Sequence, residues 1–340
     1  MQNKIFNTVV VVLSTCVFVS FFIFSHGLNS LILEMKMLDF HWVILAIFCM
    51  LLFWICETVI LYIITLTLYR SPSLLLKSIK VAMIGQFFSA ITPFQSGCQP
   101  AQLYIMTENG MPAGNSGSIL MIKFIIHQAM LTLYSIIVLI FAFSYFNSKI
   151  TYFSYFCVFG FVVNTLIILC ALLFAVNNKV TKKALWYVLS GLGKIKLVKS
   201  PQTKFTELEL ELVSFHENAA FIAKNISTCV CASFLTLLQW TAYYTIPYCI
   251  YRSFGFDLAY IWTMIAAQVF LTMFMSFIPL PGATVGAEGG FYMVFGLFFK
   301  GNTIIPALFL WRVITYYSCI GVGALFSLIP NSKIENIDVH

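Results

Sequence analysis

Long apolar runs alternate with short polar connections along almost the whole chain. The runs that exceed the roughly 20 residues needed to cross a bilayer include residues 5–24, 42–68, 119–143, 153–176, 226–250 and 303–329. Each run is expected to be an α-helix, because backbone polar groups in lipid must find their partners within the same segment. The pattern therefore predicts an all-α polytopic membrane protein with six full spans.

Two further apolar stretches, between residues 77 and 108 and between residues 258 and 300, are interrupted by proline and glycine. The interrupting residues are Pro93, Gly97 and Pro100 in the first stretch, and Pro279, Pro281, Gly282 and Gly286 in the second. Proline removes a backbone donor and glycine loosens the backbone, so neither stretch can be one unbroken helix. Broken backbone at membrane depth is tolerated only where protein or a water-filled cavity satisfies it. We therefore predict two re-entrant hairpins.

The positions of Lys and Arg predict the orientation in the membrane. Thirteen of the 19 lie in one set of connections and four in the other, while Lys123 and Arg312 fall inside apolar runs. This bias places the N-terminus, the connection 177–225 and the tail 331–340 in the cytoplasm of a bacterial plasma membrane. The two halves of this single domain (1–340), about 1–146 and 152–330, then form an inverted repeat. Such repeats place a binding site near the middle of the bilayer.

The connection 177–225 is the one sizeable polar segment of the sequence. Apolar residues recur at helical spacing opposite a row of glutamates; they are Phe205, Leu208, Leu212, Phe215 and Ile222. This spacing indicates an amphipathic helix at the cytoplasmic interface. The lysines that precede it could attract anionic lipid headgroups, or the segment could be an ordinary solvated linker.

Composition excludes several classes of function. The chain is 61% hydrophobic and 9% charged, and its net charge of +7 follows from the charges between spans, without the basic stripe that marks nucleic-acid binding. The ten cysteines are scattered and the five histidines form no cluster, so no metal site is expected. Nucleotide, nucleophile-elbow and zinc motifs are also absent from the sequence. We expect no cofactor and no soluble catalytic domain.

Ionisable residues inside the apolar runs are the best candidates for function, because an unpaired charge in a span is costly. Lys123 and His127 share one helix face, and Arg312 is followed one turn later by Tyr316. In the predicted repeat the two cations occupy matching positions and face the hairpins. One hypothesis is that they make a positively charged site for a phosphate, helped by helix N-termini at the breaks. The alternative is that they only pair with the buried acids Glu57 and Glu288.

Three glutamines lie in or near the first break: Gln95, Gln99 and Gln102. Their amides offer neutral donors and acceptors, which suit a polar headgroup or a water-lined path. Each is equally well explained as a cap for the broken backbone.

The two breaks resemble the signatures of a known family. Residues 91–104 (ITPFQSGCQPAQLY), followed by KFIIHQ at 123–128, resemble T-P-x-x-x-G-G-[EQ]-P. Residues 279–288 (PLPGATVGAE) resemble P-x-P-G-G-x-G-x-x-E, and RVITY at 312–316 resembles the R-x-x-x-Y that follows. The family is the membrane region of lysylphosphatidylglycerol synthase and its stand-alone, flippase-like relatives. The chain departs from the pattern at Cys98, which replaces the second glycine, and at Ala283-Thr284, which interrupt the usual Gly-Gly; Gln99 and Gln102 stand where the family frequently has Glu and a following Arg.

The resemblance implies a lipid translocase, which moves an anionic or aminoacylated phospholipid, or a related lipid-linked headgroup, between leaflets. Full-length members add a cytosolic transferase domain, for which no residues are present here. An aminoacyltransferase, or a subunit of one, stays open as an alternative, as does a transporter of a small soluble solute. A homo-oligomer or a lipid-modifying enzyme partner is compatible with either.

Overall fold

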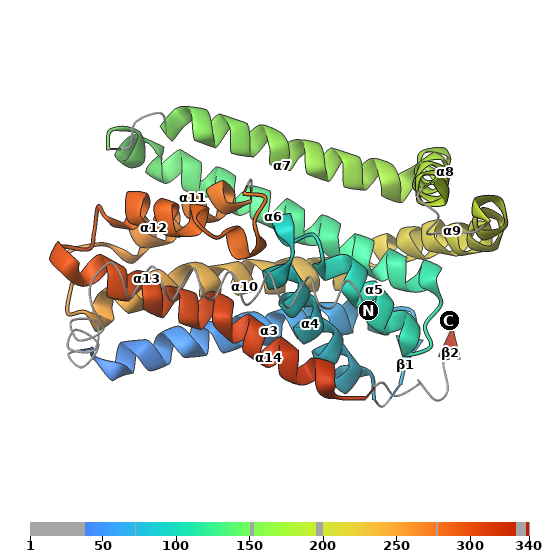
Figure 1. The fold of residues 1–340 in the computed structure, drawn as a ribbon, viewed down its shortest axis with the longest axis horizontal. Coiled ribbons are helices and arrows are strands. Elements are labelled where there is room, and N and C mark those ends of the chain that lie inside the picture. The colour runs from blue at the N-terminus through green and yellow to red at the C-terminus, as the bar shows by residue number, and fades with distance from the viewer. Residues whose placement is uncertain are drawn as a thin grey trace.

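The computed structural model describes residues 38–71, 73–149, 153–194, 200–276, 278–330 and 338–339. Regular structure in these ranges is almost entirely helical. Figure 1 shows the long helices running side by side along one axis, with α8 (Asn178–Lys194) and the start of α9 (Pro201–Lys224) at one end. The predicted first span, residues 5–24, and most of the tail 331–340 lie outside the described residues.

Within the described residues, six helical segments are long and apolar enough to cross a membrane. They are α3 (Phe40–Leu66), α4 (Leu74–Ile91), α6 (Ala113–Asn147), Val158–Val176 of α7 (Phe153–Val176), α10 (Ile226–Ser253) and Ile304–Leu328. Five of them coincide with predicted spans. The sixth, α4, was predicted as one arm of a hairpin, yet its 18 residues are long and on average apolar enough for a span, with a mean hydropathy of 1.5.

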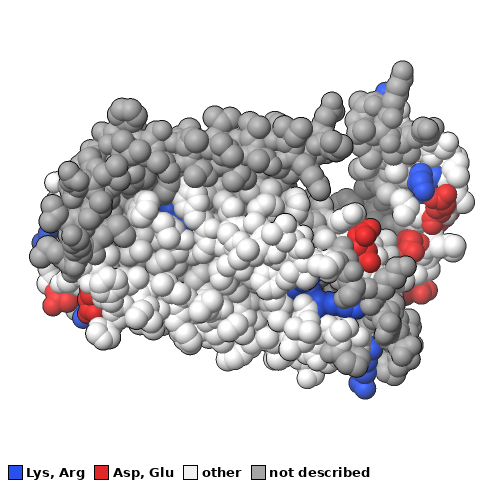
Figure 2. Space-filling model, turned by 60° about the horizontal axis from the view of Figure 1, so that its bottom comes forward, with Lys and Arg blue, Asp and Glu red and all other residues white. Residues whose placement is uncertain are grey.

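The surface has the charge distribution of a membrane protein. Figure 2 shows that the described Lys, Arg, Asp and Glu gather toward the two ends of the long axis, with a nearly uncharged middle on this face. Large apolar side chains are exposed on the long helices, among them Phe48 on α3 and Phe141 on α6. Exposed apolar surface of that extent is stable in lipid but not in water. The all-α, multi-pass architecture is thus confirmed.

Each interrupted stretch folds as two helices separated by a short 3₁₀ turn. The first consists of α4, η1 (Pro93–Gln95) and α5 (Cys98–Glu108), and the second of α11 (Ile261–Met275), η2 (Pro281–Ala283) and α12 (Gly286–Phe295). In both stretches the two helices pack against each other. At 15 and 10 residues, α11 and α12 are about 22 and 15 Å long, too short to cross a bilayer alone.

The last apolar run forms a span, as its hydropathy predicts, but it is not α-helical throughout. It follows η3 (Gly301–Thr303) and is divided into α13 (Ile304–Arg312), the π-helical turn η4 (Val313–Tyr317) and α14 (Ser318–Leu328). The π turn begins directly after Arg312. Such turns inside α-helices are frequent at functional sites, because the extra residue re-aims the side chains that follow.

The core is built around α3 and α10, which pack along each other. One cluster of buried apolar residues joins these two helices to α11, α12 and α13, and a second joins the C-terminal half of α3 to α4, α5 and α6. The strand β1 (Tyr69–Arg70), which follows α3, pairs antiparallel with β2 (Asp338–Val339). The end of the chain is thereby tied to the α3–α4 connection.

Two helices, α8 and α9, form the predicted polar connection. The C-terminal part of α9 packs on α6, where Phe215 and Ile222 are buried. The Glu211 carboxylate accepts a hydrogen bond of 2.5 Å from the backbone N–H of Gly114 in the first turn of α6. Part of the apolar stripe expected to face lipid is therefore turned toward the protein, and it fixes α9 to the start of α6.

Candidate functional site

The two 3₁₀ turns that interrupt the helices lie in contact with each other. Gly282 and Ala283 of η2 are buried, whereas no residue of η1 is. The same local sequence feature, a proline after an extended residue, begins both turns. Thr92 and Leu280 are extended, as expected of a residue that precedes proline. The next two positions after each proline have left-handed backbone, with φ of 53° and 57° at Phe94 and Gln95, and 60° and 51° at the corresponding positions of the second turn. The chain therefore reverses in the same way at both breaks.

Glycine is required in the second turn by both its backbone and its surroundings. Gly282 has a φ of 60°, and a Cβ atom there would run into the ring of Tyr316. In the first turn Gly97 lies against Thr92, whose Oγ1 accepts a 2.8 Å hydrogen bond from the Gly97 N–H. Pro93 and Pro281 begin the two turns, Pro100 lies in the first turn of α5, and Gly286 begins α12.

Lys123 and Glu57 form a buried ion pair between α6 and α3. The Lys123 Nζ donates to one carboxylate oxygen of Glu57, and Gln239 on α10 donates to the other at 3.0 Å. Gln102 on α5 accepts from the same Nζ at 3.4 Å. The two charged side chains are 9% and 4% exposed. Four helices thus converge on one pair of charges.

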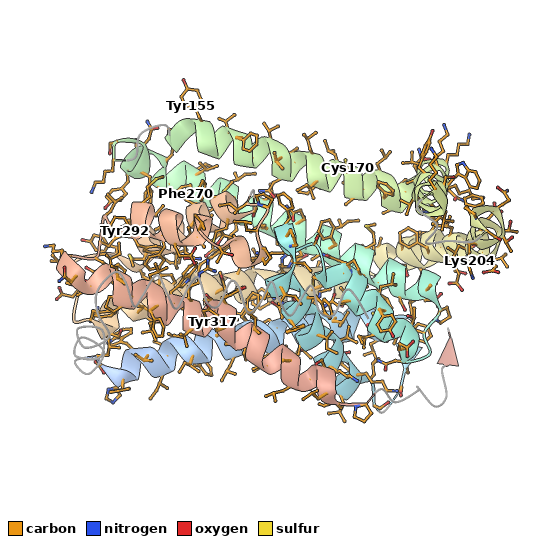
Figure 3. All side chains as sticks on the ribbon, viewed as in Figure 1. Tyr155, Cys170, Lys204, Phe270, Tyr292 and Tyr317 are labelled. Carbon is orange, nitrogen blue, oxygen red and sulfur yellow. The ribbon has the colours of Figure 1, made fainter. Side chains whose placement is uncertain are left out.

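Arg312 and Glu288 form the second buried pair. The Nε and one terminal nitrogen of Arg312 donate to a single oxygen of Glu288, at 2.9 and 2.6 Å. Its other terminal nitrogen donates at 2.9 Å to the carbonyl of Gly282 in the second break. The guanidinium carbon lies 5.1 Å from the ring centre of Tyr316. Tyr317, which follows, lies well away from both ends of the bundle in Figure 3.

A polar cavity in two adjoining compartments lies between these pairs. The first, of about 340 Å³, is lined by both members of the Lys123–Glu57 pair. The second, of about 180 Å³, is lined by Arg312 and by Gly282 of the second break. Six residues line both compartments and form the wall between them: Phe53, Gln86, Ser89, Gln95, His127 and Trp240. The shared residues place the two compartments next to each other, one beside each ion pair.

The cavity does not have the surplus positive charge that one hypothesis from the sequence required. Each of its two cations is matched by a carboxylate, as the alternative hypothesis expected. Among the described residues there is also no group of three or more His, Cys, Asp or Glu placed to hold a metal ion. The first compartment is lined by both members of its pair, Lys123 and Glu57, whereas the second is lined by Arg312, whose carboxylate partner Glu288 is not among its lining residues.

The other candidate residues from the sequence analysis also line this cavity. Gln99 and Gln102 line the first compartment, Tyr316 lines the second, and Gln95 and His127 line both. The sequence reasoning missed Gln239 and Trp240. Both lie in an apolar run, and a glutamine within a span is a signal that could have identified the first, since such a group needs a polar partner.

Fold and cavity together define a multi-pass membrane protein with an internal polar site. The chain belongs to the family described as the lysylphosphatidylglycerol synthase TM region, whose sequence model matches residues 7–323. It is also similar to a UPF0104 membrane protein of Archaeoglobus fulgidus, with 24% identity over 275 residues, which cover 76% of this chain and 78% of the relative. No solved structure matches the chain.

Proposed function

We propose that this protein translocates the headgroup of a phospholipid, or of a related lipid-linked molecule, between the two leaflets of a plasma membrane. The observation that carries the proposal is a pair of adjoining compartments, each beside a buried ion pair, in a bundle of apolar helices. Charges buried at such cost in a membrane protein mark a substrate or ion pathway. Membership of a family described by a lipid synthase agrees with a lipid substrate.

The charge balance of the cavity favours a headgroup that carries both signs, such as an aminoacylated phospholipid. A phosphate that binds Lys123 displaces Glu57, and a lone anion would then leave an unpaired carboxylate in the cavity. Because an unpaired buried charge is strongly unfavourable, a headgroup whose ammonium group occupies the carboxylate is better accommodated. The same exchange at Arg312 and Glu288 provides a second station for the headgroup.

The two stations supply a route across the membrane. We infer that the two broken stretches are hairpins that enter from opposite faces, in an inverted repeat. The matching backbone of the two turns and their mutual contact support this arrangement. The lysine and arginine distribution predicts that both termini are in the cytoplasm. In this arrangement the headgroup passes from one ion pair to the other, past His127 and Trp240, which line both compartments. The acyl chains stay in lipid.

The proposal is tested with purified protein in liposomes that contain an aminoacylated phosphatidylglycerol in one leaflet. An amine reagent that cannot cross the bilayer reports the headgroups that reach the outer surface. The informative variant is Arg312→Met combined with Glu288→Gln, because it removes both charges and leaves no unpaired ion. We expect headgroup movement to fall to the rate of protein-free liposomes while the protein still folds and inserts.

The matched control is the exposed pair on α9, Lys204 and Glu207, whose side chains are 57% and 54% exposed. The double variant Lys204→Met with Glu207→Gln removes the same charges outside the cavity and is expected to translocate at the normal rate. Unchanged movement in the Arg312 and Glu288 double variant would overturn the site assignment. Uptake of a soluble solute by liposomes without any lipid movement would favour a solute transporter instead.

A further inference from the structure

A separate groove on the lipid-facing side of the bundle lies outside the polar cavity. Its walls come from α6, α10 and α11, and its volume is about 740 Å³. Apolar side chains make up most of its surface, among them Val138, Phe141 and Ala142 on α6 and Ala266 on α11. Helices α6 and α10 also line the polar cavity. The groove lies further along these two helices, toward the end of the bundle opposite α8 and α9 (Figure 1).

The length of the groove corresponds to one leaflet. Along α6 it extends from Tyr134 to Tyr145, and the 11 steps between these two residues rise about 16 Å along the helix. The hydrocarbon core of a bilayer is about 30 Å thick, so the groove covers about half of it. Tyr134 lies near the middle of the predicted span 119–143, which places the inner end of the groove near the bilayer midplane. An acyl chain that extends from the headgroup region to the bilayer midplane has about the same length.

The outer end has the residues expected at a membrane surface. Trp262 on α11 is 72% exposed, and the Lys149 Nζ donates to the Tyr145 hydroxyl at 3.1 Å. The same Nζ lies 4.2 Å from the centre of the Tyr145 ring. Tryptophan, tyrosine and lysine concentrate where hydrocarbon meets headgroups, and an exposed ammonium group attracts a phosphate.

The inner end adjoins the polar cavity. The ring of Tyr134 lies 5.2 Å from that of Tyr244, which stacks at 5.1 Å on Trp240 in the wall between the two compartments. The Thr241 hydroxyl lies 3.4 Å from the Tyr134 hydroxyl at this end. The groove therefore stops where the apolar lining gives way to polar groups.

We propose that this groove is a binding site for one acyl chain of a phospholipid, with the headgroup at Lys149 and the terminal methyl group beside Tyr134. A protein helix from a partner or a second copy is the alternative occupant. The assignment of the groove does not depend on translocation, since it requires only that the lipid binds. If translocation also holds, the lipid bound here would be a molecule waiting beside the cavity.

The experiment uses the purified protein in nanodiscs with two photoreactive phosphatidylglycerols. One probe carries its diazirine near the carbonyl end of one chain and the other carries it near the terminal methyl group. Cross-linked residues are mapped by mass spectrometry. We expect the methyl-end probe to label Tyr134 and Thr241, and the carbonyl-end probe to label Tyr145 and Trp262. Identical maps for the two probes would overturn the proposed orientation.

A pair of variants separates a binding site from ordinary lipid contact. Ala142→Trp fills the groove and is expected to lower labelling about tenfold, because losing the burial of only two methylene groups costs roughly that factor in binding. Leu169→Trp, on the exposed side of α7, is the control and should leave labelling unchanged. Tyr155 of the same helix points away from the bundle in Figure 3.

Two further outcomes decide the remaining cases. If Ala142→Trp does not fold, Ala142→Leu fills part of the groove and should give a smaller loss in the same direction. Labelling that is no denser in the groove than around Leu169 would overturn the proposal. So would a protein-to-protein cross-link through the groove together with the mass of a dimer, which would show that a helix occupies it.

Discussion

The buried pair of Lys123 and Glu57 predicts a characteristic pattern of stability in a double-mutant cycle. Glu57→Gln leaves the Lys123 ammonium, whose side chain is 9% exposed, without a counter-charge and with only neutral acceptors, the new amide oxygen and the Gln102 oxygen at 3.4 Å. Lys123→Met leaves the carboxylate of Glu57 with one remaining donor, Gln239. Removing one partner of a buried pair costs about 3–5 kcal/mol, because the other charge stays buried without compensation.

The double variant behaves differently. With both charges gone, the cavity contains a neutral amide and a thioether, and nothing is left unpaired. Replacing a whole buried pair by uncharged groups is often neutral or stabilising by about 1–4 kcal/mol. Two single losses of about 4 kcal/mol would sum to about 8 kcal/mol if they were independent. We expect the double variant to lie within about 1 kcal/mol of the natural protein, and so the coupling to exceed 5 kcal/mol.

The measurement is reversible unfolding in lipid–detergent micelles, followed by tryptophan fluorescence. Headgroup translocation is recorded for the same variants after reconstitution into liposomes. The double variant should be stable but inactive, which separates the contribution of the pair to folding from its role in transport. Single variants that unfold like the natural protein, or a double variant that loses the sum of the two, would refute the reasoning. The exposed pair on α9 is the control and should contribute under about 1 kcal/mol.

Three further predictions concern neighbouring contacts and are checked by the same unfolding measurement. Gly282→Ala should cost about 1–3 kcal/mol, because a Cβ at φ 60° is strained and meets the ring of Tyr316. Gly289→Ala, in open space on α12, should instead stabilise by about 0.5–1 kcal/mol, and equal effects at both glycines would contradict the geometry. Glu211→Gln should cost about 0.3–2 kcal/mol by removing a negative charge from the first turn of α6, with no loss if α9 is not docked there. Gln239→Leu should cost about 1.5–3 kcal/mol, because a buried carboxylate loses a donor at 3.0 Å, and a neutral effect would show that water replaces the amide.

Much of the fold could be predicted from the sequence, because lipid imposes simple rules. Five long apolar runs became helices, and prolines marked both interruptions. Hydropathy alone could not separate α4 from a full span, since one arm of a hairpin and a short span have the same composition. The left-handed backbone at Phe94 and Gln95 could not be predicted from the sequence either, because neither residue is glycine. It is the packing of the two turns against each other that holds these conformations.

The partners of the buried charges were less accessible to sequence reasoning. Lys123 and Glu57 are 66 positions apart, and Gln239 is 182 positions from Glu57. Contacts over such separations follow from how α3, α6 and α10 pack, not from any local pattern. The sequence could state that a buried cation needs a partner. Which carboxylate provides it, and that none is left over for a free anion site, required the three-dimensional arrangement.

The pairing also explains how the chain tolerates its departure from the family signature. In the second half the acid comes from the motif itself, since Glu288 in α12 meets Arg312. In the first half the motif has Gln99 and the carboxylate comes from Glu57 in α3, which meets Lys123. The acid comes from a different place in each case, yet each buried pair consists of one cation and one anion. An unbalanced charge would be costly at membrane depth, so a carboxylate from α3 can replace one from the motif as long as the pair stays balanced. If the proposed translocation holds, a headgroup would meet a pair with the same net charge at both stations.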